Sequence, residues 1–293
     1  STFNFIAVSI ITLTLLTFMA KNSFSQNVIT PQQEKYSLLK VFVKNEQDMK
    51  SINAKGLFFD HAESHNGEYL ETWLSEREIE MLRSSGVSYE TVVEDFQNYY
   101  AGQHKMTQSE IDNSIQMSSE EFSVSHSIYG SMGGYLTFAE VVNKLDSMRL
   151  EYPNLISEKF SIGNSLQSRA MWTVRVSNNP NTTTGRPEVW FHSLIHAREP
   201  MSMEQNLFFI YWLLENYNID PVATYILENR ELYFTPVFNP DGYEYNRSTN
   251  PTGGGQWRKN RRPNTGGSYG IDLNRNFGTY AFWNSVNNGS STD

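Results

Sequence analysis

Apolar and polar positions along the first third of the chain alternate in the manner of a small α+β unit. Two-residue periodicity predicts strands, and three- to four-residue periodicity predicts helices. The strands are expected at 36–43, 56–59, 69–74 and 89–93, and the helices at 45–54 and 76–84. The second helix begins with a capping box, because Ser75 is followed three residues later by Glu78. The resulting order βαββαβ predicts a ferredoxin-like domain over residues 36–100.

A different pattern, in which strands alternate with longer helices, begins near residue 132. Thr137 and Glu140 form another capping box, which predicts a helix ending near residue 151. Strands are expected at 171–176, 188–195 and 231–238, helices at 200–217 and 221–229, and a turn at 239–242. The strand at 188–195 is mostly apolar, so we expect it to lie in the centre of its sheet. The pattern predicts an α/β domain.

Two further segments lie outside these patterns. Phe5 to Ala20 is apolar and uncharged. It is short for a membrane span and typical of the core of a signal peptide, with a membrane anchor or a buried helix as alternatives. Ser23 and Ser25 provide small residues for cleavage, so residues 1–25 are predicted to be a signal peptide. Residues 101–131 are rich in Ser, Gln and Glu and are predicted to form a linker.

The amino-acid composition limits the kinds of site and partner that the chain can have. The chain has no cysteine, so a disulfide scaffold, a thiolate metal site and a cysteine nucleophile are excluded, and a metal must bind His, Asp or Glu. Its net charge of −9 argues against binding to nucleic acid. The segment from Arg247 to Arg275 nevertheless contains six basic residues and one acid, Asp272. This segment favours an anionic ligand, with a solvated basic loop as the alternative.

The first candidate for chemistry follows the strand at 188–195. His196 and Glu199 are three positions apart, where an imidazole nitrogen and a carboxylate oxygen can reach one cation such as Zn²⁺. Taken alone, two residues with this spacing more often form a surface pair than a metal site. His192 precedes His196 by four residues, but Ser193 follows it where a zincin helix needs Glu, so we expect a packed histidine.

Three later motifs favour the interpretation of His196 and Glu199 as metal ligands. They are Asn239-Pro240-Asp241-Gly242-Tyr243, Trp257-Arg258-Lys259-Asn260-Arg261 and Asp272-Leu273-Asn274-Arg275-Asn276. Together with His196-Ala197-Arg198-Glu199 they resemble the zinc metallocarboxypeptidases of the pancreatic A/B type and their bacterial relatives. Residues 87–95 are similar to the last strand of that family's activation propeptide, which is itself ferredoxin-like. The resemblance therefore extends over roughly residues 36–282.

The resemblance implies a zinc site and its immediate support. His196 and Glu199 would be two zinc ligands, and Arg258 would polarise the scissile carbonyl and hold the oxyanion. Asp272 would accept a hydrogen bond from the second ring nitrogen of His196, which fixes the tautomer of a metal-bound histidine. The catalytic domain, residues 132–293, would have a mixed central sheet flanked by helices.

The same resemblance implies how a substrate is held. Asn274 and Arg275 would clamp the free C-terminal carboxylate of a peptide, and Arg198 would line the subsite beyond. A guanidinium suits this task because it binds a carboxylate through two parallel hydrogen bonds. The expected partner is therefore a peptide or protein with a free C-terminus.

The chain also departs from the family. A catalytic zinc has three protein ligands and a water. The family's third ligand is a histidine about a hundred residues after the first, but no histidine follows His196. The family's general-base Glu, substrate-capping Tyr and specificity pocket also lie further along. We therefore expect an N-terminal fragment of the enzyme rather than a truncated and inactive relative. Residues 132–293 would be the N-terminal half of the catalytic domain.

The leading hypothesis is a secreted zinc carboxypeptidase precursor, extracellular or periplasmic and detached from the membrane once the signal is removed. Residues 36–100 would cover the active-site mouth, and cleavage in the linker, for example after Lys105, would free the enzyme. One alternative is a catalytically inactive, carboxypeptidase-like binding module that keeps the carboxylate clamp. Another is a related amide hydrolase that acts on cell-wall peptides. The oligomeric state is not predicted.

Overall fold

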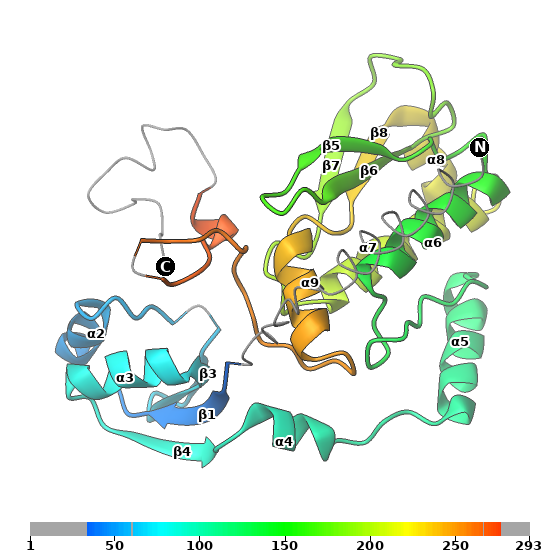
Figure 1. The fold of residues 1–293 in the computed structure, drawn as a ribbon. Helices are drawn as coiled ribbons and strands as arrows, with labels where there is room; N and C mark the ends of the chain where they lie inside the picture. The colour runs from blue at the N-terminus through cyan, green and yellow to red at the C-terminus, as the bar shows by residue number, and fades with distance from the viewer. Residues whose placement is uncertain (1–33, 60, 266, 277–293) are drawn as a thin grey trace, which may run out of the picture. The chain divides into compact units, whose positions relative to one another are not determined.

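The computed structural model describes residues 34–59, 61–265 and 267–276 (Figure 1). The predicted signal peptide and the end of the chain lie outside the described residues. Two separate hydrophobic cores organise the rest, one formed by side chains between Leu39 and Val87 and the other by side chains between Val124 and Tyr243. We call the first region, residues 34–101, the N-terminal subdomain and the second, residues 124–276, the body.

A four-stranded antiparallel sheet forms the N-terminal subdomain. Its elements are β1 (Tyr36–Val41), α2 (Glu46–Asn53), β2 (Glu63–His65), β3 (Tyr69–Ser75), α3 (Glu76–Ser85) and β4 (Tyr89–Val93). The strands lie in the order β2-β3-β1-β4, so the chain has the element order expected from the sequence. Leu39 of β1 is fully buried, as are Ile52 of α2 and Leu82 of α3, because both helices pack on the sheet.

The position of the second strand was predicted wrongly. Residues 57–59 form no strand, and β2 lies further along at Glu63–His65. Leu57 is apolar because it fills the core from a loop, with 2% of its surface exposed. The three residues of β2 are all polar, so a hydrophobic pattern does not reveal them. The signal that was available is Asn66-Gly67, whose positive φ angles of 52° and 75° form the turn into β3.

The predicted linker contains regular structure. After α4 (Phe96–Ala101), the 15-residue helix α5 (Gln108–Phe122) occupies half of residues 101–131. Its N-terminus has a complete capping box, in which the Thr107 hydroxyl accepts from the backbone of Glu110 and the Glu110 carboxylate accepts from the backbone of Thr107. Only Ile111 of this helix is buried, which is why its hydrophobic pattern is weak.

The body contains a mixed four-stranded sheet with helices packed along it (Figure 1). The strands are β5 (Phe160–Asn164), β6 (Ala170–Val176), β7 (Glu188–His192) and β8 (Glu231–Thr235), and the helices are α6 (Phe138–Glu151), α7 (Met201–Glu215), α8 (Pro221–Asn229) and α9 (Pro240–Thr249). Their order is β5-β6-β8-β7, and only the β7–β8 pair is parallel. The expected α/β fold with a mixed sheet is confirmed. Within the described ranges, no helix combines the length and the apolar character that a membrane crossing requires.

The strand expected at 188–195 is shorter and less central than its composition indicates. β7 ends at His192 and pairs with β8 at one edge of the sheet as far as the structure describes it. Phe191 stacks on Phe234 of β8, whereas Trp190, on the other face, is 47% exposed. The strand ends because Leu194 adopts a left-handed backbone with φ of 51°, which turns the chain out of the ladder.

Candidate functional site

One hydroxyl contacts both ends of the segment between β7 and α7, residues 193–200. Ser202, near the start of α7, accepts a hydrogen bond from the backbone N–H of Leu194 at 3.1 Å. The same hydroxyl donates to the carbonyl of Glu199 at 2.7 Å. Both ends of the segment are therefore fixed to the first turn of α7, and this turn positions His196 and Glu199 beyond the strand.

A second helix, α9, also contacts this segment. Residues 239–242, predicted as a turn, are in fact the start of α9, where the Asn239 side chain caps the backbone N–H of Gly242 and Pro240 occupies the first helical position. The other end of the Asn239 amide donates to the carbonyl of Ile195. A Cβ atom on Gly242 would lie 2.4 Å from the carbonyl oxygen of Lys259 and 2.8 Å from Cβ of Ala197. Glycine is required here because α9 touches both segments.

Asn246, also on α9, joins the segment that carries His196 to the segment that carries Arg258. Its Nδ2 donates to the carbonyls of Ala197 at 2.9 Å and Trp257 at 2.8 Å, and its Oδ1 accepts from the backbone of Trp257. The backbone N–H of Ala197 in turn donates to the carbonyl of Arg258. Buried amide groups of this kind fix a backbone because every unmet hydrogen bond would be costly.

Four of the predicted site residues meet on this support. His196 Nδ1 lies 3.0 and 3.1 Å from the two carboxylate oxygens of Glu199, and His196 Nε2 lies 3.3 Å from Asp272 Oδ1. Arg258 Nε donates to the other oxygen of Asp272 at 2.9 Å, and its Nη1 lies 3.8 Å from Glu199 Oε1. His196 and Asp272 are each only 4% exposed. A buried imidazole therefore stands between two carboxylates.

The charges in this group stabilise one another. Burial opposes ionisation of Asp272, but hydrogen bonds from His196 and Arg258 outweigh it and hold the pKa of Asp272 well below its usual value. The pKa of Glu199 is also lowered, because His196, His61 and Arg258 together outweigh its burial. Burial lowers the pKa of His196, yet its hydrogen bonds to Asp272 and Glu199 raise it overall.

The donor set fits a zinc ion. Zinc binds imidazole nitrogen and carboxylate oxygen at about 2.0–2.1 Å in a tetrahedron, which separates two ligand atoms by about 3.3 Å. His196 Nδ1 and the Glu199 oxygens are close to that separation. Asp272, on the opposite side of the ring, has the position of a carboxylate that would orient a metal-bound histidine. Without the ion, an N–H at His196 Nδ1 would donate a hydrogen bond to the Glu199 carboxylate and keep the two side chains together.

A second histidine, which sequence reasoning missed, lies beside His196 and Glu199. His61 belongs to the loop before β2, and its Nε2 is 3.0 Å from Glu199 Oε1. His61, His196 and Glu199 can each offer a ligand atom within 4.8 Å of the others. No spacing signal in the sequence could have found His61, because it lies in the other region of the chain and reaches the site only through the fold.

A cavity of about 270 Å³ opens next to the three residues. It is lined by His61, Thr72, Trp73, Arg198, Glu199 and Gln256. Arg198, predicted to line a substrate subsite, thus faces a space that residues of the N-terminal subdomain close. Burial lowers the pKa of Arg198, and the nearby Arg258 lowers it further, while Tyr36 and Glu78 of the subdomain act in the opposite direction.

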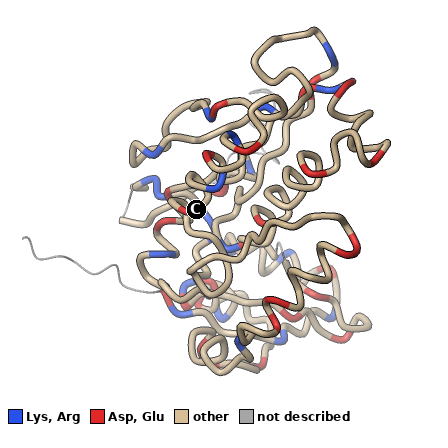
Figure 2. Tube along the Cα trace, turned by 90° about the vertical axis from the view of Figure 1, so that its right-hand side faces the viewer, with Lys and Arg blue, Asp and Glu red and all other residues tan. Residues whose placement is uncertain are grey.

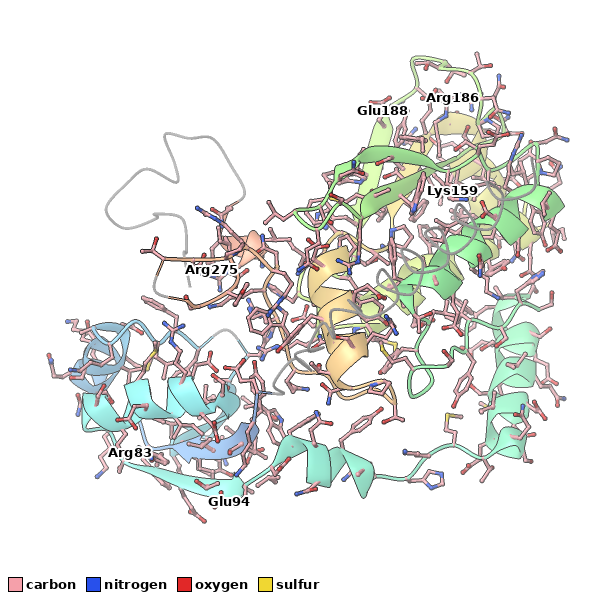
Figure 3. All side chains as sticks on the ribbon, in the orientation of Figure 1. Arg83, Glu94, Lys159, Arg186, Glu188 and Arg275 are labelled. Atoms are coloured by element: carbon pink, nitrogen blue, oxygen red, sulfur yellow. The ribbon has the colours of Figure 1, made fainter. Side chains whose placement is uncertain are left out.

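The predicted carboxylate clamp follows Asp272 directly. Asn274 and Arg275 lie in a short 3-10 turn (Leu273–Arg275), in which the Asn274 backbone donates to Asp272 Oδ1 at 2.8 Å. The Asn274 side chain is exposed. Arg275, labelled in Figure 3, donates to the carbonyl of Asn274. The turn therefore places Asn274 and Arg275 next to Asp272, the carboxylate that contacts His196 Nε2.

Three of the basic residues of 247–275 have partners within the body. Arg247 pairs with Glu244 at 2.8 Å, and Arg258 pairs with Asp272. The guanidinium of Arg261 stacks on three aromatic rings, those of Tyr245, Trp257 and Tyr269. Over the chain as a whole, Figure 2 shows Lys and Arg interspersed with Asp and Glu.

Comparison with known proteins gives a consistent family. A model of the zinc carboxypeptidase family matches residues 141–293. A zinc carboxypeptidase of Saccharothrix mutabilis subsp. capreolus is 37% identical over 145 residues, which are 50% of this chain and 32% of that protein. Human carboxypeptidase A1 is 31% identical over 198 residues, 67% of this chain and 43% of the human protein. The chain thus spans less than half the length of these relatives.

Solved structures agree at the level of the fold. The crystal structure of carboxypeptidase A from Helicoverpa armigera aligns with a TM-score of 0.59 and 23% identity, covering 84% of this chain and 58% of that one. Thrombin-activatable fibrinolysis inhibitor aligns with a TM-score of 0.54 and 20% identity, covering 84% and 60%. At these identities the likeness concerns architecture alone.

Proposed function

Because the chain belongs to the zinc carboxypeptidase family, we propose that residues 132–293 form the zinc-binding half of an active site that removes residues from the C-terminus of peptides. The arrangement around His196 carries this proposal. Its ring nitrogens face Glu199 and Asp272, and Arg258 is anchored on Asp272 beside them. A histidine and a carboxylate directed at one point are two of the three protein ligands that a catalytic zinc needs, and a second carboxylate behind the histidine is the usual partner of a metal-bound imidazole.

Each residue of the site has a task in this reaction. His196 and Glu199 hold the ion, which when bound supplies a Lewis acid and lowers the pKa of water. Asp272 keeps His196 in the tautomer that leaves Nδ1 for the metal. Arg258, held through Nε by the same Asp272, is oriented beside Glu199, where a substrate oxyanion would gather charge.

The substrate would be recognised by its end. Asn274 and Arg275 bind the terminal carboxylate, and Arg198 lines the subsite next to the cavity. An internal peptide bond has no carboxylate at this position, so the clamp selects chain ends. Burying an unpaired guanidinium against an amidated end would forfeit the charge-assisted hydrogen bonds.

We also propose that residues 36–100 are a ferredoxin-like propeptide-type domain, joined through residues 101–131 to the enzyme, in a protein that is secreted. The order βαββαβ and the sheet order β2-β3-β1-β4 support the first part. The alignments over 84% of the chain support it too, because residues 132–293 are only 162 of 293 residues, or about 55%. The apolar run from Phe5 to Ala20 supports secretion.

Substitution of Arg275 in the full-length protein tests the proposed activity. Arg275→Ala should raise KM for a peptide with a free C-terminus by roughly 10- to 100-fold, because a charge-assisted hydrogen bond contributes about 1.5–3 kcal/mol. Steady-state hydrolysis of that peptide and of its C-terminally amidated twin measures the effect.

Arg262→Ala is the matched control, since Arg262 is an exposed basic residue of the same segment. It should leave KM unchanged. Equal hydrolysis of the free and amidated peptides by the unsubstituted protein, or an Arg275 variant with the original preference for free ends, would overturn the proposal.

A further inference from the structure

His61 reaches the candidate zinc site from outside the body. It lies in the loop between α2 and β2 of the N-terminal subdomain, and its Nε2 is 3.0 Å from Glu199 Oε1. Its ring stands nearly perpendicular to that of His196, at 81° with 5.9 Å between the centroids. The side chain is 54% exposed, so burial of apolar surface does not explain its position. What brings it here is its polar end, directed at Glu199.

The environment of His61 suits a metal ligand. Imidazole nitrogen is one of the ligand types that zinc binds in proteins. The nitrogen of His61 belongs to the set of three atoms that lie within 4.8 Å of one another. His196 and Glu199 supply two ligands, and the family's third is a histidine further along the chain, so His61 would take the fourth position, which water holds in a catalytic zinc site.

We propose that His61 is a ligand of the zinc, supplied by the N-terminal subdomain to the pair formed by His196 and Glu199. This inference rests on the proposed function. Zinc then links the subdomain to the body across the 270 Å³ cavity. The coordination position that His61 takes is closed to water and to a substrate carbonyl. The subdomain is therefore an internal inhibitor that acts through the metal itself, and it must withdraw His61 before substrate can bind.

A second contact holds the subdomain in the same orientation. Tyr100 of α4 lies on the backbone of three glycines of the body, Gly133, Gly253 and Gly254, where an added Cβ would come within 2.5–2.7 Å of the tyrosine. Beside it, Gln97 donates to the carbonyl of Gly254 at 2.6 Å. The aromatic contact and the metal bond lie on different elements of the subdomain, so together they oppose both its rotation and its departure.

Zinc affinity of the full chain tests this inference without any assay of activity. Zinc is titrated against a competing chelator at pH 7 for the unsubstituted chain and for His61→Ala, His65→Ala and His196→Ala. We expect His61→Ala to weaken zinc binding at least tenfold. His65→Ala, four residues away in the same subdomain, should bind zinc as tightly as the unsubstituted chain, because His65 stacks on Tyr69. In the cobalt-loaded chain, His61→Ala should also shift the visible absorption bands, since one nitrogen ligand is lost.

The variants separate this inference from the function on which it rests. If His61→Ala binds zinc with unchanged affinity and gives an unchanged cobalt spectrum while His196→Ala loses the metal, His61 is not a ligand and the proposed site stands. If His196→Ala keeps the original affinity, the proposed site itself is wrong. The apo form of His61→Ala should melt at the original temperature, because the side chain is largely exposed. This excludes unfolding as the cause of weaker binding.

Discussion

The two regions of the molecule bury different kinds of side chain. Among the described residues of the N-terminal subdomain, the buried polar ones are Ser37, Thr72 and Ser75, none of which carries a charge. In the body the buried polar residues include six ionisable ones: Arg175, His196, Glu204, Glu231, Asp241 and Asp272. Burying a charge is costly unless a partner compensates it. The body therefore needs ion pairs and hydrogen bonds for its buried charges, whereas the core of the subdomain is stabilised by apolar packing.

Most of the buried charges in the body have a partner, but only some belong to the candidate site. Arg175 lies 3.4 Å from Glu231, and Asp241 accepts from Arg169 at 2.8 Å. These two pairs tie strands and loops together and include no residue of the candidate site. Asp272 differs because both of its partners, His196 and Arg258, have a task in the proposed chemistry. Burial of a charge is thus a weaker sign of function than convergence of several charges on one point.

The largest expected effect comes from breaking each core in turn. Phe234→Ala, which removes a fully buried ring of the body, should lower the free energy of unfolding of that region by about 3–5 kcal/mol. Leu39→Ala, at the matching position of the subdomain core, should cost about 2–5 kcal/mol there. Amide hydrogen exchange, resolved by peptide, measures both regions in one experiment.

If the two cores are independent, Leu39→Ala should speed exchange in residues 36–93 and leave β6 and β8 protected. Equal loss of protection in both regions would show that the cores unfold together, and would contradict the separation drawn here. Phe234→Ala should instead expose β6 and β8.

A smaller effect is expected at Glu204, the buried carboxyl of α7, which forms no ion pair with a residue that the structure describes. Its Oε1 accepts from the backbone of Leu136 at 2.8 Å, and burial raises its pKa from 4.5 to about 7. Because the folded state keeps the proton, stability is full below pH 4.5 and falls as the pH rises to 7, by about 3 kcal/mol. Glu204→Gln keeps the acceptor and should remove this fall.

Urea unfolding of both proteins between pH 4 and 8 measures the difference, in which the contributions of other carboxyl groups cancel. The variant should be the more stable of the two at pH 8. Parallel stability curves for the two proteins would mean that Glu204 ionises normally in the fold.

Local signals in the sequence predicted most of the elements. The capping boxes at Ser75 and Thr137 begin α3 and α6 as expected, and the α/β pattern with a mixed sheet is present. The errors arise where the hydrophobic pattern is silent or ambiguous. The polar strand β2 and the polar helix α5 have little buried surface, and the apolar strand β7 lies at a sheet edge in the described part. Pairing partners, rather than composition, decide these cases.

The candidate site also contains residues that the sequence indicated and one residue that it did not. His196, Glu199, Arg258 and Asp272 were indicated by motifs, and the fold brings them into contact, while their roles stay predictions. His61 has no motif. Its place at the site depends on the loop before β2 and on how the subdomain meets the body, which are consequences of tertiary structure alone.

The central claim is that His196 and Glu199 together bind one zinc ion. Calorimetric titration of the metal-free chain with zinc, compared with Glu199→Gln, tests it most directly, because glutamine keeps the shape of the side chain and removes its charge. The account predicts one zinc per unsubstituted chain and at least a tenfold loss of affinity in the variant. A chain that takes up no zinc, or a variant that binds it equally well, would contradict the account.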